Sequence, residues 1–171
     1  MMIQCYFGNG KGKTTASVGA AIRYAGCKKQ VLYVSFLKDG TSSELNILKA
    51  IPGIDVQIPP VSYRLFDNRN PEKNRKFTEA YTRFFCEEID GIFSRYDMIV
   101  LDEILDVVAF GYIEEETFLN QLKSWSKTTE IVLTGHKISP KISEICDYIS
   151  EITSRKHPYE KGIAPRFGIE Y

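Results

Sequence analysis

The chain has 171 residues, of which 43% are hydrophobic and 26% charged, so it suits one globular domain with a substantial core and is not a disordered chain. Its 22 basic and 22 acidic residues balance, whereas nucleic-acid-binding proteins usually carry a basic surplus, so that class is disfavoured. No apolar run approaches the roughly 18 residues of a membrane-spanning helix. We therefore expect a soluble protein.

The cysteines and the first residues bear on the compartment. The cysteines lie far apart and include no Cys-x-x-Cys pair, which indicates reduced thiols rather than a disulfide framework. The chain starts almost directly with an expected strand, which leaves no room for a targeting segment. Both observations predict a cytoplasmic protein. The cysteines are Cys5, Cys27, Cys86 and Cys146.

In the first half of the chain, short apolar runs alternate with longer helical stretches, which is typical of a parallel sheet covered by helices. We expect a helix closed by Gly26 at its C′ position, and a short helix capped by Ser42 or Ser43. Residues 59–70 are the least regular part and predict a surface loop with a functional role. The expected strands are 3–7, 31–36 and 54–58, and the expected helices are 14–25 and 44–50.

The second half continues the alternation. Asn70-Pro71 places a capping residue before a proline at the first helical position, and the helix that follows is expected to reach about Arg95. Its predicted inner face consists of Phe77, Tyr81, Phe84, Phe85, Ile89 and Ile92. Further helices are expected at 104–110, at 114–125 and after Ser139-Pro140, and strands at 98–101, 131–133, 148–152 and 167–170. Without a repeat or a boundary, the pattern predicts one α/β domain over residues 1–171, with three layers and a mostly parallel sheet.

A glycine-rich segment between the first strand and the first helix carries the strongest chemical signal. Gly12, Lys13 and Thr14 fit the end of the P-loop pattern GxxxxGK[ST], and Gly8 is the candidate first glycine, so the loop is one residue short. Loop amides and the helix N-terminus bind phosphates, the lysine adds charge, and the threonine hydroxyl is a natural Mg²⁺ ligand. With this loop, the expected fold class is a three-layer, RecA-like P-loop NTPase fold with a mostly parallel sheet. The alternative is a turn without a ligand. The predicted triphosphate-binding residues are Gly8, Asn9, Gly10, Lys11, Gly12, Lys13, Thr14 and Thr15.

An apolar strand ends in two carboxylates, Asp102 and Glu103, at the sheet edge where α/β proteins bind ligands. We expect Asp102 to hold Mg²⁺ with Thr14, directly or through water. Glu103 is expected to orient a water, contact the ribose or complete the metal shell. The alternative is a strand-to-helix turn with Asp102 as N-cap. Thr134 and Gly135 end another strand at this edge and are candidate phosphate contacts, or else a plain turn.

The remaining titratable residues show no further catalytic arrangement. His136 is more typical of a surface position than of catalysis, and His157 is either structural or a substrate contact. The sequence holds no Ser-His-Asp, zinc-binding or paired-carboxylate pattern. Any chemistry proposed for this chain must therefore proceed without a general base of those kinds.

These motifs resemble, over nearly the whole chain, those of the ATP:corrinoid adenosyltransferases whose ATP site is a P-loop. The phosphate loop is similar to that of the family, including its short length, and Arg23 falls where the family has a nucleotide-site arginine. His136 stands where the family tends to carry arginine. Further segments that resemble family motifs are 35–38, 100–103, 134–135, Lys156-His157, Gly162 and the terminal Gly-Ile-Glu-Tyr at 168–171.

The resemblance implies that a Co(I) corrinoid attacks C5′ of ATP and expels triphosphate, in adenosylcobalamin synthesis or salvage. Co(I) is a nucleophile without a proton to remove, which agrees with the missing general base. The protein would orient C5′ and stabilise the leaving triphosphate through Lys13, Thr14 and Mg²⁺ on Asp102. In the family, ATP lies reversed relative to other P-loop enzymes, which exposes C5′. Tyr63 and Phe66 are the nearest matches to an aromatic pair that would face the corrinoid.

The resemblance also implies partners, and two other classes of function stay open. The implied partners are ATP, a corrinoid, a flavoprotein reductase that supplies Co(I), and a second copy of the chain in a homodimer; nucleic acid and membrane are not expected. One alternative is a P-loop NTPase or small-molecule kinase, in which Glu103 positions a water or hydroxyl for attack on the γ-phosphate. The other is a non-catalytic module that binds ATP or corrinoid. The phosphate product separates these classes.

Overall fold

The computed structural model describes residues 1–38, 40–61 and 71–169, and its centre is a six-stranded sheet. All paired strands run parallel, in the order β3-β2-β4-β5-β1-β6. This arrangement confirms the predicted α/β fold class. The strands are β1 (Ile3–Phe7), β2 (Val31–Ser35), β3 (Ile54–Gln57), β4 (Met98–Asp102), β5 (Glu130–Gly135) and β6 (Tyr148–Glu151).

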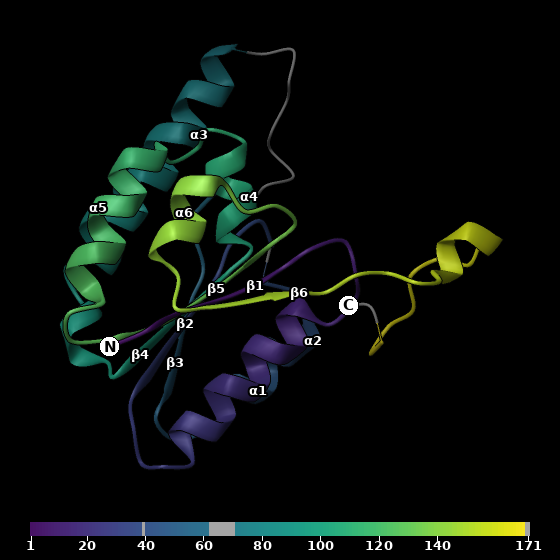
Figure 1. Cartoon of the computed structure of the whole chain (residues 1–171), viewed down its shortest axis with the longest axis horizontal. Coiled ribbons are helices and arrows are strands. Elements are labelled where there is room, and N and C mark those ends of the chain that lie inside the picture. The colour runs from purple at the N-terminus through teal and green to yellow at the C-terminus, as the bar shows by residue number, and fades with distance from the viewer. Residues whose placement is uncertain (39, 62–70, 170–171) are drawn as a thin grey trace.

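Helices cover both faces of the sheet and give the predicted three layers (Figure 1). On one face lie α1 (Lys13–Ala25) and α2 (Ser43–Leu48). On the other lie α3 (Pro71–Arg83), α4 (Ile104–Ala109), α5 (Glu115–Trp125) and α6 (Pro140–Ile145). A short 3-10 helix, η4 (Pro158–Lys161), projects away from the sheet near the C-terminal end. Within the described residues, no helix is long and apolar enough to cross a membrane.

Two hydrophobic cores fill the space between the layers, because the inner strands are buried on both faces. The smaller core, under α1 and α2, includes Tyr33 and Leu45. The larger one, under α3 to α6, is rich in aromatic rings. Trp125 packs 5.0 Å from Phe85, between ring centroids, and its indole N–H donates to Asp90 at 2.7 Å. The larger core thus includes a hydrogen-bond partner for the indole N–H of Trp125, its largest side chain.

The parallel register brings the C-terminal ends of the strands to one edge of the sheet. Ser35 at the end of β2 pairs with Asp102 at the end of β4, and Phe7 at the end of β1 pairs with Gly135 at the end of β5. The loop that follows Phe7 therefore emerges beside the end of β5, with the end of β4 one strand further along the sheet. This edge holds the candidate site.

The helix predicted over residues 71–95 begins at Pro71 but is not continuous. After Arg83 it turns into a π-helix, η2 (Phe84–Ile89), and a separate 3-10 helix, η3 (Phe93–Arg95), follows. Phe84 and Phe85 are adjacent and both buried, and the wider π turn allows two neighbouring residues to face the core. The predicted inner-face residues are buried, with Ile92 partly so.

Two further expectations were wrong. Gly26 has φ −60° and is right-handed, and the left-handed conformation after α1 falls on Lys28, with φ 60°. Residues 167–169 form a turn rather than a strand, because Gly168 at φ 74° interrupts any extended run. Of the other predictions, the capping role of Ser139 is confirmed by its bond from Ile142 N, and the cysteines form no disulfide.

Candidate functional site

The glycine-rich loop is held between the ends of β5 and β6. Gly8 N donates to Gly135 O at 3.2 Å, and Gly10 N donates to Ile152 O at 2.8 Å. Gly8 and Gly12 have φ near +120°, a conformation that favours glycine. A Cβ atom on Gly8 or Gly10 would also collide with the backbone of Ile152. Backbone conformation therefore favours glycine at position 12, close packing favours it at position 10, and both reasons apply at Gly8.

Lys13 lies at the start of α1 and folds back over the loop, where its Nζ donates to Gly10 O at 3.0 Å. Burial lowers the pKa of Lys13, and the charges of Asp106, Glu103 and Asp102 oppose that shift. The lysine is thus a partly desolvated cation beside the loop amides. This is the environment in which a P-loop lysine contacts phosphate.

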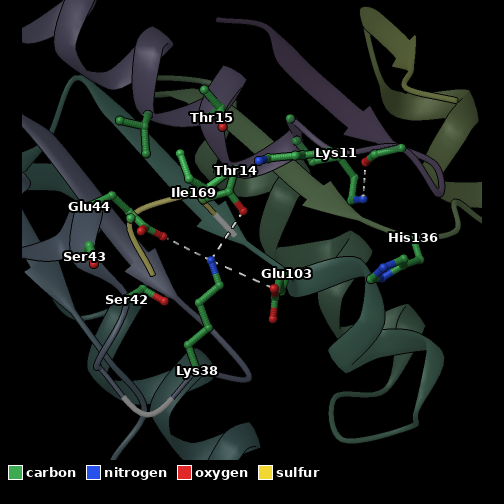
Figure 2. Close-up of a pocket in the computed structure, with 15 residues that line it drawn as sticks. Lys11, Thr14, Thr15, Lys38, Ser42, Ser43, Glu44, Glu103, His136 and Ile169 are labelled. Atoms are coloured by element: carbon green, nitrogen blue, oxygen red, sulfur yellow. Dashed lines mark hydrogen bonds and ion pairs between the residues drawn. The ribbon is translucent and has the colours of Figure 1, made fainter. Parts of the chain in front are cut away.

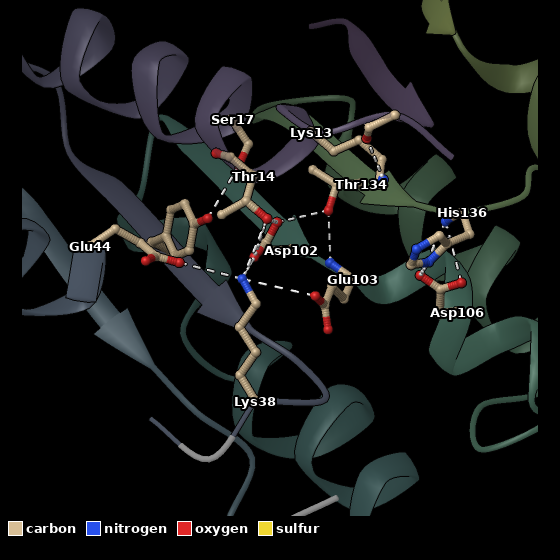
Figure 3. A network of polar contacts seen from close by, with 12 residues as sticks. Lys13, Thr14, Ser17, Lys38, Glu44, Asp102, Glu103, Asp106, Thr134 and His136 are labelled. Carbon is tan, nitrogen blue, oxygen red and sulfur yellow. Dashed lines mark hydrogen bonds and ion pairs between the residues drawn. The ribbon is translucent and has the colours of Figure 1, made fainter. Parts of the chain in front are cut away.

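Asp102 is the centre of a buried polar network that joins four elements (Figure 3). Its Oδ1 accepts from Thr14 Oγ1 at 3.1 Å and from Thr134 Oγ1 at 2.8 Å, and its Oδ2 accepts from Lys38 Nζ at 2.7 Å. Thr134 Oγ1 in turn accepts from Glu103 N at 2.8 Å. These contacts fix the carboxylate relative to the phosphate loop before any ligand binds.

Lys38 is a site residue that sequence reasoning did not assign. Besides Asp102, its Nζ lies 3.3 Å from Thr14 Oγ1, 3.4 Å from Glu44 Oε1 and 3.9 Å from Glu103 Oε1. Burial lowers the pKa of Lys38, but the nearby carboxylates outweigh burial and the net pKa is raised. A lysine shortly after the end of a buried strand, at the edge where Asp102 also lies, was the available signal.

The oxygens around Lys38 fit Mg²⁺. A threonine hydroxyl, Thr14, and a buried carboxylate, Asp102, already converge on a cation here, and hard oxygen donors are what Mg²⁺ prefers. Ser35, the register partner of Asp102, has a buried hydroxyl that lacks a hydrogen-bond partner among the described residues. Within those residues no cluster of three His, Cys, Asp or Glu side chains forms a metal site, so phosphate and water would complete the shell.

Glu103 has a left-handed backbone, with φ 64°, which turns its N–H toward Thr134. Such conformations in non-glycine residues are uncommon and cluster at functional sites. Burial raises the pKa of Glu103 to about 7, with Asp102 and Asp106 adding to the shift and Lys38 and His136 opposing it. Its side chain borders the cavity described next.

A cavity of about 440 Å³ opens beside the phosphate loop, which is within the range of small-molecule sites (Figure 2). It brings together the loop, Lys38, residues 42–44, and the C-terminal residues Gly168 and Ile169. A second cavity of about 470 Å³ lies on the β6 side of the loop, where Asn9 Oδ1 accepts from Ser154 N at 3.1 Å. His136 borders both cavities.

The structure brings most of the predicted residues together. Residues 10–15 and Glu103 line the first cavity, and Gly8 and Asn9 line the second. Asp102, Thr134 and Gly135 are buried at the adjoining strand ends. Arg23 is exposed in the last turn of α1 and is not among the residues that line either cavity. Tyr63 and Phe66 lie outside the described residues.

Comparison with known sequences gives one consistent result. The family model described as "ATP:corrinoid adenosyltransferase BtuR/CobO/CobP" matches residues 1–171. A corrinoid adenosyltransferase of Escherichia coli K12 is 31% identical over 176 aligned positions, which cover 99% of this chain and 85% of the relative. Corrinoid adenosyltransferase CobA of Salmonella typhimurium is 30% identical with the same coverage.

Comparison with solved structures shows the fold alone. The cytoplasmic domain of EssC superposes with a TM-score of 0.54 at 19% identity, over 96% of this chain and 33% of that one. EssC ATPases 2 and 3 from Geobacillus thermodenitrificans give 0.53 at 20% identity, over 99% of this chain and 36% of that one. The chain thus spans about a third of these two structures and shares their α/β architecture.

Proposed function

The chain belongs to the ATP:corrinoid adenosyltransferase family, and we propose that its phosphate-loop cavity transfers the 5′-deoxyadenosyl group of ATP to the Co(I) centre of a corrinoid, releasing triphosphate. The observation that carries this is the buried network around Asp102. It holds Thr14 and Lys38 beside the loop, where a leaving triphosphate needs positive charge. The family match does not favour the γ-phosphate alternative.

The bond changes of this reaction explain what the site lacks. Cobalt supplies the electron pair of the new Co–C5′ bond, the C5′–O5′ bond breaks, and its electron pair leaves with the triphosphate. Cobalt is thereby formally oxidised from Co(I) to Co(III). Because no proton is removed from the nucleophile, the protein needs to orient C5′ and stabilise negative charge, not to supply a base.

We assign the charge stabilisation to the loop amides, Lys13 and Lys38. Lys13 would exchange its contact with the Gly10 carbonyl for a phosphate oxygen. Thr14 and Asp102 would hold Mg²⁺, which supplies further positive charge to the triphosphate when bound. The loop and both lysines lie in place around the cavity without it.

Three predicted substrate contacts stay proposals. Arg23 lies in the last turn of α1, so we propose that it contacts ATP only at a part of the nucleotide outside the phosphate-loop cavity. Tyr63 and Phe66 are proposed as corrinoid contacts on the family resemblance alone. The preferred corrinoid, cobalamin or an incomplete precursor, is a matter for assay.

The partners and compartment are proposed on the same basis. We propose a cytoplasmic homodimer that receives its Co(I) corrinoid from a flavoprotein reductase. The exposed apolar side chains of the C-terminal region support a partner surface: Tyr148 is 59% exposed and Phe167 is 78% exposed. Analytical ultracentrifugation tests the dimer directly.

One assay tests the proposed function. MgATP and chemically reduced cob(I)alamin are mixed with the protein under anaerobic conditions in dim light, and both the corrinoid spectrum and the phosphate product are followed. We expect light-sensitive adenosylcobalamin with stoichiometric triphosphate. ADP or inorganic phosphate with an unchanged corrinoid would establish γ-phosphate chemistry instead.

A further inference from the structure

Asp106 and His136 form a pair beside the phosphate loop that the roles above do not use. Asp106 lies in α4 and is 8% exposed, and His136 directly follows Gly135 at the end of β5. The Asp106 carboxylate accepts from the backbone N–H of His136, at 3.1 Å to Oδ2, and ring atom Nδ1 lies 3.0 Å from the same oxygen. The imidazole is therefore held at two points (Figure 3).

Gly135 makes this close approach possible. A Cβ atom there would lie 3.1 Å from Asp106 Oδ2 and 2.5 Å from Leu105 Cβ, so a side chain would push α4 away from the strand end. The contact between Asp106 and His136 thus depends on the meeting of two secondary-structure elements. It is not a chance encounter of two long surface side chains.

The pairing determines which ring nitrogen is left for a ligand. An ionised carboxylate only accepts hydrogen bonds, so Nδ1 of His136 carries a hydrogen and Nε2 is the remaining nitrogen. Among the described residues Nε2 has no hydrogen-bond partner, and the side chain is 62% exposed. Figure 2 shows the imidazole at the rim of the phosphate-loop cavity.

The charges around His136 suit an anionic ligand only if the ring is protonated. Asp106 and Glu103 face it from the start of α4, Lys13 lies across the loop, and Lys137 and Glu151 border the second cavity with it. A triphosphate near this group would be repelled by an unpaired Asp106. An imidazolium cancels that charge and presents Nε2–H as a charge-assisted donor.

We propose that His136, oriented by Asp106, is a phosphate-binding residue whose protonated ring donates from Nε2 to the triphosphate of ATP and to the triphosphate that leaves. This rests on the proposed function for the identity of the leaving group. His136 touches the substrate, whereas Asp106 is a positioning residue. The contact is a hydrogen bond throughout, so no proton is transferred.

The test measures binding of Mg²⁺-tripolyphosphate by calorimetry at about pH 5.5 and about pH 8, the range in which histidine changes charge. We expect wild type to bind about tenfold tighter than His136→Gln at the lower pH, the effect of one charge-assisted hydrogen bond of about 1.5 kcal/mol. The ratio should fall toward one at the higher pH. Titration of the ligand itself is common to both proteins and cancels in the ratio.

Two further variants separate charge from shape. His136→Arg keeps a cation at both pH values and should bind better than His136→Gln at each. In an Asp106→Asn background, where the ring lacks its carboxylate partner, His136→Gln should weaken binding by a smaller factor at the lower pH than it does in the otherwise wild-type protein, a comparison in which the lost Asp106 charge cancels. Lys29→Gln, at a residue that pairs with Asp97 at the opposite end of the strands and lines neither cavity, is the control and should behave as wild type.

Equal affinities of wild type and His136→Gln at the lower pH would overturn the proposal. So would a His136→Arg protein that binds no better than His136→Gln. The probe contains neither adenosine nor corrinoid, so failure of adenosyl transfer in wild type would count against the proposed function and leave this result intact.

Discussion

The phosphate end of the sheet and the C-terminal segment, which consists of β6 and the residues after it, both resemble family sequence. At the phosphate end the polar side chains are buried and bonded to one another, whereas the C-terminal segment is largely exposed. At the phosphate end, Asp102 is fully buried and accepts bonds from Thr14, Lys38 and Thr134. In β6 every residue is exposed, and beyond it Phe167 is 78% exposed. The two regions touch where Gly10 N donates to Ile152 O.

The difference follows from what each region does in the proposed reaction. Charge that develops on the triphosphate is best stabilised by groups already in position, and the Asp102 network provides them. Exposed apolar side chains gain free energy only when something covers them, which for this segment would be a substrate or another subunit. The predictions below test whether the first region is as preorganised, and the part of the second region beyond β6 as dispensable for folding, as their contacts indicate.

The largest effect is expected for Lys13→Ala. Loss of a desolvated cation and its hydrogen bonds to phosphate should weaken MgATP binding roughly 1,000-fold, about 4 kcal/mol. Calorimetric titration with MgATP measures this. Lys29→Ala is the control, because Lys29 pairs with Asp97 at the opposite end of the strands. Full affinity in the Lys13 variant would refute the loop assignment.

Gly8→Ala should break the junction between the two regions. It places a Cβ against the Ile152 carbonyl at φ 117°, and we expect a loss of about 3 kcal/mol in the free energy of unfolding. Gly12 has nearly the same φ, 120°, but open space around it, so Gly12→Ala should cost only the backbone strain, about 2 kcal/mol. Urea denaturation of both variants separates the cost of the collision with Ile152 from the cost of the backbone conformation. Equal losses of unfolding free energy would show that Ile152 does not constrain the loop.

Thr134→Val keeps the side-chain volume but removes the hydroxyl that joins Asp102 to the amide of Glu103. The buried donor left behind should cost about 2 kcal/mol of unfolding free energy. Thr117→Val, at an exposed hydroxyl bonded to Glu114, should stay within about 0.5 kcal/mol of wild type. If Thr134→Val left the free energy of unfolding unchanged, the hydrogen bonds around Asp102 would contribute less to stability than their distances indicate.

The smallest effect is expected for Phe167→Ala. Because its ring is exposed, its removal should change the free energy of unfolding by less than about 0.5 kcal/mol in the same denaturation experiment. A loss above about 1 kcal/mol would show that the C-terminal segment already takes part in the folded core, and the contrast between the two regions would fail.

The parts of the site that sequence predicted best are those set by short spacing. Glycines followed by Lys13 and Thr14 at a strand-to-helix junction have few structural solutions, and an apolar strand ending in Asp102 delivers a carboxylate to the sheet edge. Lys38 was not assigned because its contact with Asp102, 64 residues away in the sequence, depends on β2 lying beside β4. Sequence order does not state which strands are neighbours.

Other differences have equally local causes. Thr134 was a candidate phosphate contact or part of a plain turn; its hydroxyl is buried and bonded to Asp102, and the phosphate contact stays a proposal. The spacing of apolar residues predicted the inner face of the helix after Pro71. Phe84 and Phe85 are adjacent and both buried, which requires a π turn, and a constant spacing of 3.6 residues does not predict one. Pattern methods locate an apolar face more readily than a change of helix type along it.

The position of β6 has a consequence for the order of events during synthesis. The phosphate loop leaves the ribosome well before Ile152, the residue that holds its glycines in place. A nascent chain that stops before β6 carries the complete loop sequence without the strand that shapes it. Competence to bind nucleotide is therefore gained late in translation, after nearly all of the sheet has been made.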